Sequence, residues 1–486
     1  MVTRKPPKEK PNDHGGLISY NPDTKTIEVK GLDHLDLWDL LPYSEDAEHL
    51  ILHEGLLSIE NSEIVLFPKI TSLNLPKSLK MIGEFGLSGM AFETIEIPPS
   101  VTCFGLAIFT GSSNLRYVSI PCTVTKIDSA TFGLCKELKK VSLPDNLEYI
   151  PDRTFELCEA LEEITIPDSV KTIDRDAFLL CKSLKKIVLP EHLENIGNGA
   201  FGSCSSIKSI TIPENLREIP PYMLSGCTSL KEIVYLGTIE SIGYGAFSDT
   251  GLESLCLPDT VHEISSRLFR RCSELKRVTV PDTIKIIRSG AFEECKTLES
   301  IEISESVTLI EKETFRGCKA LKSFIFPNQT YSVQTEIFKG CIKLKEVTLS
   351  ENLLEIWPSA FEDCKSLKSI ILPESLESIR KNAFKGCMHL ETIIIPNSVK
   401  TIEKNAFENC KSLRTLVLSN SLEFIEEGTF KGCTSLESVT IPGSVHSIIR
   451  EAFGDCINLH NVTYEDKVQY IHKNAFKGTY YSMNNA

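Results

Sequence analysis

The chain places proline at nearly constant intervals of 23 residues, or a multiple of 23, along most of its length. The prolines at this position are Pro76, Pro98, Pro121, Pro144, Pro167, Pro190, Pro213, Pro258, Pro281, Pro327, Pro373, Pro396 and Pro442. Other residues hold the places where proline is missing, and counting from His53 to Glu465 gives about 19 registers. A fixed period of about 20–50 residues is typical of a solenoid, in which each turn packs only on its two neighbours.

Each position in the repeat has a physical meaning. Six residues before the proline stands a leucine such as Leu161 or Leu184, and three and one before it stand apolar residues such as Ile164 and Ile166. The alternation predicts a short strand with one buried face. The proline ends this strand because it has no N–H to give to a sheet.

The second half of each turn holds a further apolar segment. Three and six residues after the proline come Val170 and Ile173, and the pair Ala177-Phe178 follows. A turn of 23 residues is too short for a full helix, a strand and their loops. We therefore predict a mainly-β repeat solenoid, a right-handed arc with one long parallel sheet, and short strands and single helical turns on the other side.

The units resemble the BspA-like leucine-rich repeat family, whose repeats read roughly LxxIxIPxSVxxIxxxAFxxC. The segment CEALEEITIPDSVKTIDRDAFLLC, residues 158–181, matches this pattern at nearly every place. The resemblance covers about residues 50–478. It implies a leucine-rich repeat solenoid of the kind found in bacterial and protist surface proteins, some of which attach to host cells or extracellular matrix.

The two ends of the chain depart from the repeat. Residues 1–16 are charged and proline-rich, which predicts a disordered tail and no secretory signal peptide. We expect residues 17–52 to form an N-terminal cap, a strand and a short helix with Leu35, Leu37 and Trp38 as its apolar face. The leucine-rich repeat solenoid of about 18–19 rungs is then expected over residues 53–480, with a short tail at 481–486.

Fourteen of the 17 cysteines share one position, three residues after the phenylalanine. They are Cys135, Cys158, Cys181, Cys204, Cys227, Cys272, Cys295, Cys318, Cys341, Cys364, Cys387, Cys410, Cys433 and Cys456. Neighbouring rungs about 4.8 Å apart would allow disulfides, but the unbroken runs hold odd numbers of cysteines, five and nine. We favour a structural ladder of small buried thiols, with disulfides and a metal site as the alternatives.

Composition and motifs argue against several functions. A net charge of −14 is unsuited to nucleic acid, and the sequence has no apolar run long enough for membrane insertion. None of the common catalytic, nucleotide-binding or metal-binding motifs occurs. We expect no enzyme activity, no catalytic residues, no cofactor, no metal and no small-molecule substrate.

The outward positions of the predicted sheet lie two and four residues before the proline. Over three rungs they hold only uncharged, mostly β-branched residues: Ser369, Ile371, Thr392, Ile394, Thr415 and Val417. An exposed apolar patch rimmed by polar residues is a candidate binding surface for a protein. Strand propensity alone is the alternative explanation, because Ile, Val and Thr suit exposed strands.

Two hypotheses of function follow. In the first, the chain is a non-enzymatic adhesion or recognition protein at the cell surface, as the resemblance implies, and binds a host-cell or matrix protein through the exposed face of its sheet. In the second it is an intracellular scaffold with the same fold and an intracellular partner. The free cysteines and the missing signal peptide favour this cytoplasmic alternative.

Overall fold

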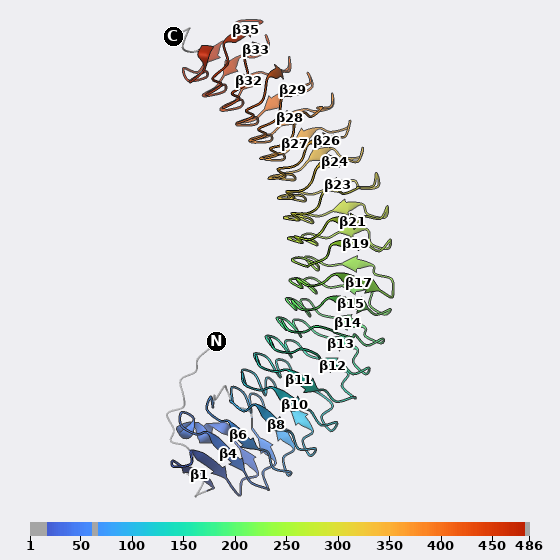
Figure 1. Ribbon diagram of the computed structural model, residues 1–486, viewed down its shortest axis with the longest axis vertical. Coiled ribbons are helices and arrows are strands. Elements are labelled where there is room, and N and C mark those ends of the chain that lie inside the picture. The colour runs from blue at the N-terminus through green and yellow to red at the C-terminus, as the bar shows by residue number, and fades with distance from the viewer. Residues whose placement is uncertain (1–16, 61–66, 482–486) are drawn as a thin grey trace. The chain divides into compact units, whose positions relative to one another are not determined.

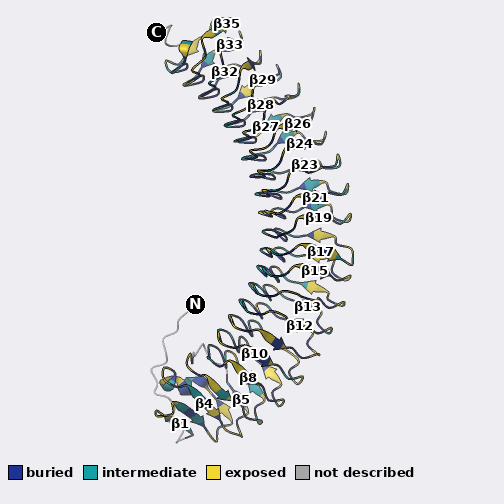
Figure 2. Ribbon diagram, in the orientation of Figure 1, coloured by how far each residue is buried: buried dark blue, intermediate teal, exposed yellow. Residues whose placement is uncertain are grey.

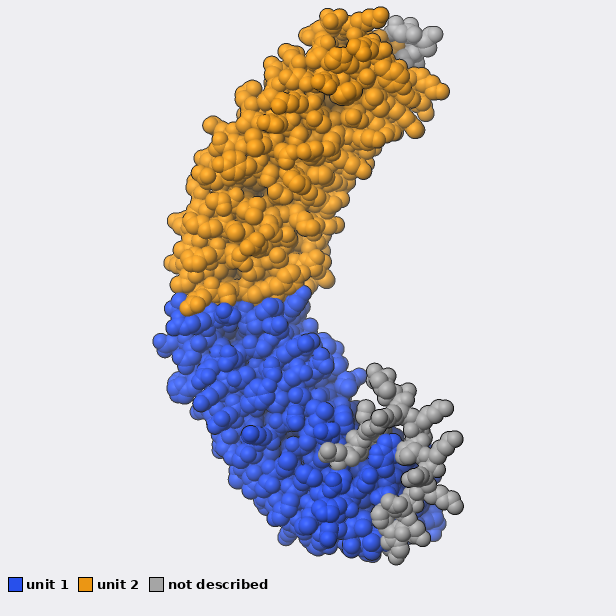
Figure 3. Space-filling model, turned by 180° about the vertical axis from the view of Figure 1, so that it is seen from behind, with its two compact units in different colours: residues 1–238 blue, residues 239–486 orange. Residues whose placement is uncertain are grey.

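The computed structural model describes residues 17–60 and 67–481, and the expected tails at 1–16 and 482–486 lie outside them. The chain falls into two compact units, residues 1–238 and 239–486, which Figure 3 draws in different colours. Within each unit the backbone winds through successive turns stacked one on the next (Figure 1). The prediction of a mainly-β solenoid is confirmed, with about 19 turns in the chain.

Most turns contribute a strand just before the proline place, and these strands form the first strand row. In unit 1 the row is β2 (Thr26–Val29), β4 (His49–Leu52), β6 (Ser72–Asn74), β8 (Thr94–Glu96), β10 (Tyr117–Ser119), β11 (Lys140–Ser142), β15 (Ser209–Ile212) and β17 (Glu232–Tyr235). In unit 2 it is β19 (Ser254–Cys256), β21 (Arg277–Thr279), β24 (Ser323–Ile325), β26 (Glu346–Thr348), β29 (Thr392–Ile394), β31 (Thr415–Val417), β33 (Ser438–Ile441) and β35 (Asn461–Tyr464).

A two-residue strand after the proline position gives the second strand row. In unit 1 it is β3 (His34–Leu35), β5 (Ser58–Ile59), β7 (Met81–Ile82), β9 (Cys103–Phe104), β12 (Tyr149–Ile150), β13 (Thr172–Ile173), β14 (Asn195–Ile196) and β16 (Glu218–Ile219). In unit 2 it is β18 (Ser241–Ile242), β20 (Glu263–Ile264), β22 (Ile286–Ile287), β23 (Leu309–Ile310), β25 (Ser332–Val333), β27 (Glu355–Ile356), β28 (Ser378–Ile379), β30 (Thr401–Ile402), β32 (Phe424–Ile425), β34 (Ser447–Ile448) and β36 (Tyr470–Ile471).

Pairing within both rows is parallel and keeps the repeat register, as in Thr392↔Thr415 and Ile394↔Val417 between β29 and β31. The predicted single long sheet is broken into segments of two to four strands. Some neighbouring turns share only an isolated bridge, such as Ser369↔Thr392. Strands of two to four residues offer few ladder bonds, and the proline that follows gives none, so the ladder is interrupted easily.

The predicted single helical turns are absent from the described repeat. Within residues 17–60 and 67–479 the only helix is η1 (Leu37–Tyr43), a 3-10 helix near the N-terminal end. Around each phenylalanine the chain instead makes consecutive turns with left-handed residues on both sides, such as Ala130 (φ 54°) and Leu134 (φ 64°). This alternation directs N–H groups at the next turn: Ala130, Phe132 and Leu134 donate to the carbonyls of Asp152, Thr154 and Glu156 at 2.8–2.9 Å.

At the N-terminal end β1 (Ile18–Asn21) pairs antiparallel with β2. The next strand pairings, β2 with β4 and β3 with β5, are already parallel. Parallel stacking therefore begins at Thr26, inside the segment expected to be a cap. Leu35 and Leu37 are buried as expected and Trp38 is half-buried, whereas the buried Leu40 was not anticipated.

The core of each unit is a stack of identical positions. Burial alternates with exposure along every turn (Figure 2). Phenylalanine rings lie face to face on successive turns, with centroids 5.1–5.3 Å apart from Phe109 to Phe201 and 5.1–5.7 Å apart from Phe269 to Phe476. Each ring fills the middle of one turn and also packs on its neighbours, which joins the turns into a continuous core.

Candidate binding surface

The fourteen aligned cysteines are all buried beside the phenylalanine stack and are free thiols. Every one of their Sγ atoms lies 3.0–3.4 Å from the carbonyl oxygen at the phenylalanine position of the preceding turn. The same carbonyl also accepts the N–H of the cysteine in its own turn, as Phe132 does from Cys135 at 3.1 Å. One thiol therefore uses the second lone pair of a buried carbonyl.

The residues that replace cysteine keep a comparable hydrogen bond. Ser112 donates to the carbonyl of Leu87, one turn back, at 3.0 Å. Thr250 and Thr479 donate instead to Phe247 and Phe476 of their own turns, at 2.8 and 2.7 Å. The position thus holds a small donor in every case, which explains why the same three residue types recur there.

The buried thiols are poorly suited to nucleophilic chemistry. Burial raises the pKa of Cys158 and Cys318 well above the ordinary value of a thiol, and it also raises the pKa of Cys181. It raises the pKa of Cys272 to about 11. Because the thiolate is the reactive and metal-binding form, these side chains are inert at neutral pH. Cys103, Cys122 and Cys256 lie outside the column and are exposed.

The six predicted binding residues lie together on three neighbouring turns of unit 2. Ser369 bridges to Thr392, and β29 pairs with β31, so the two outward columns run side by side. Ile371, Ile394 and Val417 are 88, 59 and 48% exposed. Ser369 and Thr415 are also exposed, and Thr392 is half-buried.

The exposed apolar column extends beyond the predicted patch. Ile325 is 65% exposed at the same position of β24, two turns before Ile371 and separated from it by Thr348. We call Ile325, Thr348, Ile371, Ile394 and Val417 the apolar stripe. The repeat spacing alone places Ile325 in this column. The charged Glu346, on the same turn as Thr348, interrupts the run of uncharged outward residues, so the patch predicted from the sequence begins only at Ser369.

A hollow lies beside the apolar stripe at the ends of its strands. It measures about 600 Å³ and is lined by Thr348, Ile371 and Pro373 together with the carboxylates of Glu351 and Glu374. Unit 1 has a hollow of about 660 Å³ in a similar setting, lined by Val188, Thr211, Leu236, Glu191 and Glu214 among others. Leu236 stands where most turns have the proline, and it donates its N–H to the carbonyl of Ile212 at 3.0 Å.

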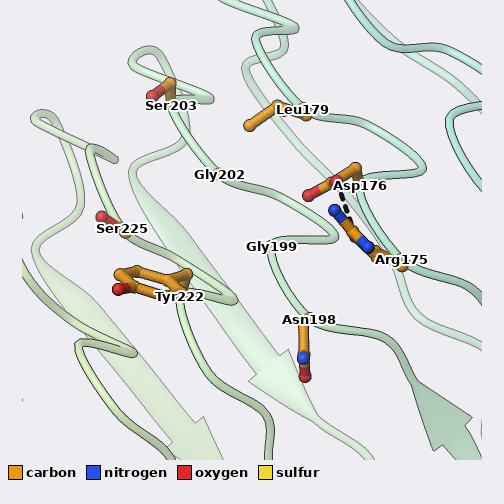
Figure 4. Close-up of a pocket in the computed structure, with 9 residues that line it drawn as sticks. All are labelled: Arg175, Asp176, Leu179, Asn198, Gly199, Gly202, Ser203, Tyr222 and Ser225. Atoms are coloured by element: carbon orange, nitrogen blue, oxygen red, sulfur yellow. Dashed lines mark hydrogen bonds and ion pairs between the residues drawn. The ribbon is translucent and has the colours of Figure 1, made fainter.

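A third hollow lies among the phenylalanine-flanking turns of unit 1 (Figure 4). It measures about 400 Å³, and its charged side chains Arg175 and Asp176 pair with each other at 3.1 Å. Gly199 and Gly202 leave this space because they carry no side chain. Its charges are already satisfied, so it offers weaker recognition chemistry than the stripe.

Within residues 17–60 and 67–481, no group of three or more His, Cys, Asp or Glu side chains is arranged to hold a metal ion. In that same part of the chain, no helix has the length and apolar character needed to cross a bilayer.

Comparison with known sequences identifies the repeat. A sequence model of the BspA type leucine-rich repeat region, built of six copies, matches residues 57–181, 148–276, 240–368 and 355–482. The chain belongs to the BspA-type leucine-rich repeat family. Members of this family are typically binding scaffolds that interact with proteins, and a search of the curated proteins found no match to this chain.

A solved structure gives the same fold. A leucine-rich repeat protein from Bacteroides ovatus is 28% identical over 68% of this chain and 86% of its own, with a TM-score of 0.54. A leucine-rich cell surface protein from Faecalibacterium prausnitzii is 20% identical, over 93% of this chain and 94% of its own, with a TM-score of 0.40. The predicted family is confirmed.

Proposed function

We propose that the chain is a non-enzymatic adhesion protein that binds a host-cell or matrix protein through the first strand row of unit 2. The observation that carries this proposal is the apolar stripe, in which Ile371 is 88% exposed between the strands β26 and β29 of the first strand row. Leaving a large β-branched side chain in water forgoes the free energy of its burial, which a partner recovers on binding. The family's general role in protein interaction supports the same reading.

Beads coated with the chain test this proposal directly. We expect them to adhere to cultured epithelial cells or to a layer of their cell-free matrix. The double variant Ile371→Lys/Ile394→Lys should lower adhesion about tenfold or more, because charged groups would then have to be desolvated at the centre of the interface. Both side chains point to solvent, so circular dichroism and the melting temperature should remain close to those of the parent.

Val188→Lys is the matched control, because Val188 is an exposed β-branched residue at the same repeat position in unit 1. Its adhesion should equal that of the parent chain. Full adhesion by the Ile371→Lys/Ile394→Lys chain would remove the stripe from consideration. Failure of the parent-coated beads to adhere to either surface would contradict the adhesion role itself.

The exposed thiols favour a second candidate, an intracellular scaffold. Cys103, Cys122 and Cys256 are free and exposed, and exposed thiols persist most readily in a reducing compartment. A membrane-impermeant biotin reagent applied to intact expressing cells separates the two candidates. Labelling of the chain supports the surface role, and labelling only after lysis supports the scaffold.

A further inference from the structure

We propose that the partner of the apolar stripe presents acidic side chains next to its apolar contact. This inference rests on the proposed function and names the chemistry of the partner. It comes from Lys322, Lys345 and Lys368, which occupy the same repeat position, five residues before the proline place, on three successive turns. We call these three residues the lysine ladder, and all three are exposed.

Charges at this repeat position normally neutralise one another between turns. Lys185 pairs with Glu162 at 2.7 Å, Lys276 with Glu253 at 2.9 Å, and Lys322 with Glu299 at 2.6 Å. In every pair the lysine belongs to the turn that follows the glutamate. An ammonium group at this position is therefore satisfied by a carboxylate one turn earlier.

Lys345 and Lys368 break this rule because each follows another lysine. Neither makes an ion pair in the part of the chain that the structure describes, although Glu391 occupies the turn after Lys368. Neighbouring turns are about 4.8 Å apart, so the stacked ammonium groups repel one another. An approaching carboxylate would relieve this repulsion, which makes the ladder a site with a built-in preference for anions.

The lysine ladder lies beside the apolar stripe along the same strands. Lys345 directly precedes β26, and Lys368 directly precedes the bridge residue Ser369. Ammonium groups thus stand where the stripe's strands begin, and Glu351 and Glu374 stand beyond their ends. Glu346 is the acidic residue between them. A partner that covers Ile371 meets the lysines on one flank and must present carboxylates there.

A comparable run in unit 1, Lys185, Lys208 and Lys231, has a different setting. Its first lysine is paired as in the lysine ladder, Lys185 with Glu162 and Lys322 with Glu299, so the difference lies in the residues beside the run. The outward positions beside this run carry two charged residues, Lys186 and Glu232, whereas those beside the lysine ladder carry one, Glu346, and the apolar column of unit 2 continues to Ile394 and Val417. Unit 2 therefore combines a lysine ladder with a continuous apolar column, and this combination favours a protein partner over a polysaccharide, which has no apolar side chains to place on Ile371 and Ile394.

The inference can be tested with a displayed library of random 12-residue peptides, selected on the immobilised full chain. We expect the enriched peptides to combine Asp or Glu with Val, Ile, Leu or an aromatic residue. Their affinity should fall about tenfold for Lys345→Glu/Lys368→Glu, because attraction becomes repulsion. The control Lys312→Glu/Lys381→Glu makes the same charge change at exposed lysines of other repeat positions and should bind within about twofold of the parent.

A stability measurement separates recognition from a structural role. Lys345→Glu places a carboxylate between two lysines and restores the charge alternation seen at Lys185 and Glu162. We expect its melting temperature to rise by on the order of 1 °C while peptide affinity falls. If Lys345 served the fold alone, the variant would lower the melting temperature and leave peptide affinity unchanged.

Each remaining outcome decides a different statement. Enriched peptides without acidic residues, or an empty selection, overturn the acidic partner. Peptides that lose affinity for Ile371→Lys/Ile394→Lys but not for Lys345→Glu/Lys368→Glu leave the proposed function standing and remove the charge preference. Peptides that tolerate the isoleucine changes contradict the stripe itself. Retention on a sulfated-polysaccharide resin, with no peptide enriched, replaces the protein partner by a polyanion.

Discussion

The turns from Lys139 to Lys186 in unit 1 and those from Lys322 to Ile394 in unit 2 share one interior and differ outside. In unit 1 the outer charges satisfy each other: Lys140 lies 3.7 Å from Glu163, and Lys182 lies 3.0 Å from Glu159. In unit 2 the repeat position of Glu162 and Lys185 holds the lysine ladder, and the repeat position of Val188 holds the apolar stripe. Lys322 still pairs with Glu299 at 2.6 Å, but Lys345 and Lys368 make no ion pair among the described residues.

The difference shows that the inward positions of each turn stabilise the fold, whereas the outward positions are free to differ from turn to turn. Phe178 and Phe384 are both fully buried, and both rings stack on a neighbour at 5.1–5.3 Å. These interior positions hold the same residue in most turns, with Leu224 in place of phenylalanine in one of them, because each turn must fit the next. The outward positions touch no interior group, so they vary without cost to the core.

The largest expected effect tests the shared interior. Phe178→Ala and Phe384→Ala should each lower the free energy of unfolding by about 3–5 kcal/mol, since each leaves a cavity in a ring stack. Urea titration followed by circular dichroism measures both. The two losses should agree within about 1 kcal/mol, and a much larger gap would mean that the two regions do not share one core.

A smaller effect is expected at the thiol position. Cys181→Val and Cys387→Val remove the donor to the carbonyls of Phe155 and Phe361, which lie 3.2 Å from the respective Sγ atoms. Each change should cost about 1 kcal/mol, because the carbonyl loses one of its two hydrogen bonds. Cys181→Ser keeps a donor and should cost less. Equal losses for valine and serine would show that packing alone maintains the column.

The smallest effect concerns the outer charges. Glu162→Lys would create in unit 1 a stack of lysines like that in unit 2, and should lower the melting temperature by on the order of 1 °C. It is the mirror image of Lys345→Glu, which should raise it. Calorimetry of both variants, at low and high salt, measures the difference. Melting-temperature shifts of the same sign for both variants would contradict the idea that alternating charges at this position stabilise the fold.

The pH dependence of this contact has a definite sign. The side-chain hydrogen bond and the charge of Lys185 lower the pKa of Glu162. The pair therefore stabilises the fold at neutral pH, and its contribution is lost as the pH falls through the lowered pKa. Glu162→Gln should be destabilising at pH 7 and indistinguishable from the parent in strong acid. A loss that persists in acid would assign the effect to packing.

Much of the fold follows from the sequence because the interior repeats. Three residues recur at fixed places in the turn: the leucine six residues before the proline, the phenylalanine and the cysteine. Each place has the same surroundings in every turn, so about nineteen repeats together predict a structure that one repeat would indicate only weakly. The stripe residues Ile371, Ile394 and Val417 were found by the same counting. Their exposure followed from the alternation of buried and exposed residues before the proline place.

Other features left little or no trace in the sequence. The left-handed residues flanking each phenylalanine include Leu134, Arg153 and Asp176, so residue type does not predict the left-handed backbone conformation. The parallel stacking that begins at Thr26 lies outside the proline pattern. The lysine ladder was visible as three lysines 23 residues apart, but its meaning needed the observed pairing of each lysine with the preceding glutamate.

The carbonyl at the phenylalanine position accepts one hydrogen bond from its own turn and one from the thiol of the next turn. This arrangement affects how the chain can gain or lose whole turns. Because every turn is fastened to its neighbours by the same contacts, a block of 23 residues can be duplicated or lost with both new junctions already complementary. A duplication between Thr348 and Val417 would lengthen the stripe by one side chain. The number of turns in this chain would thereby set how many side chains the stripe presents to a partner, without any change to the remaining residues.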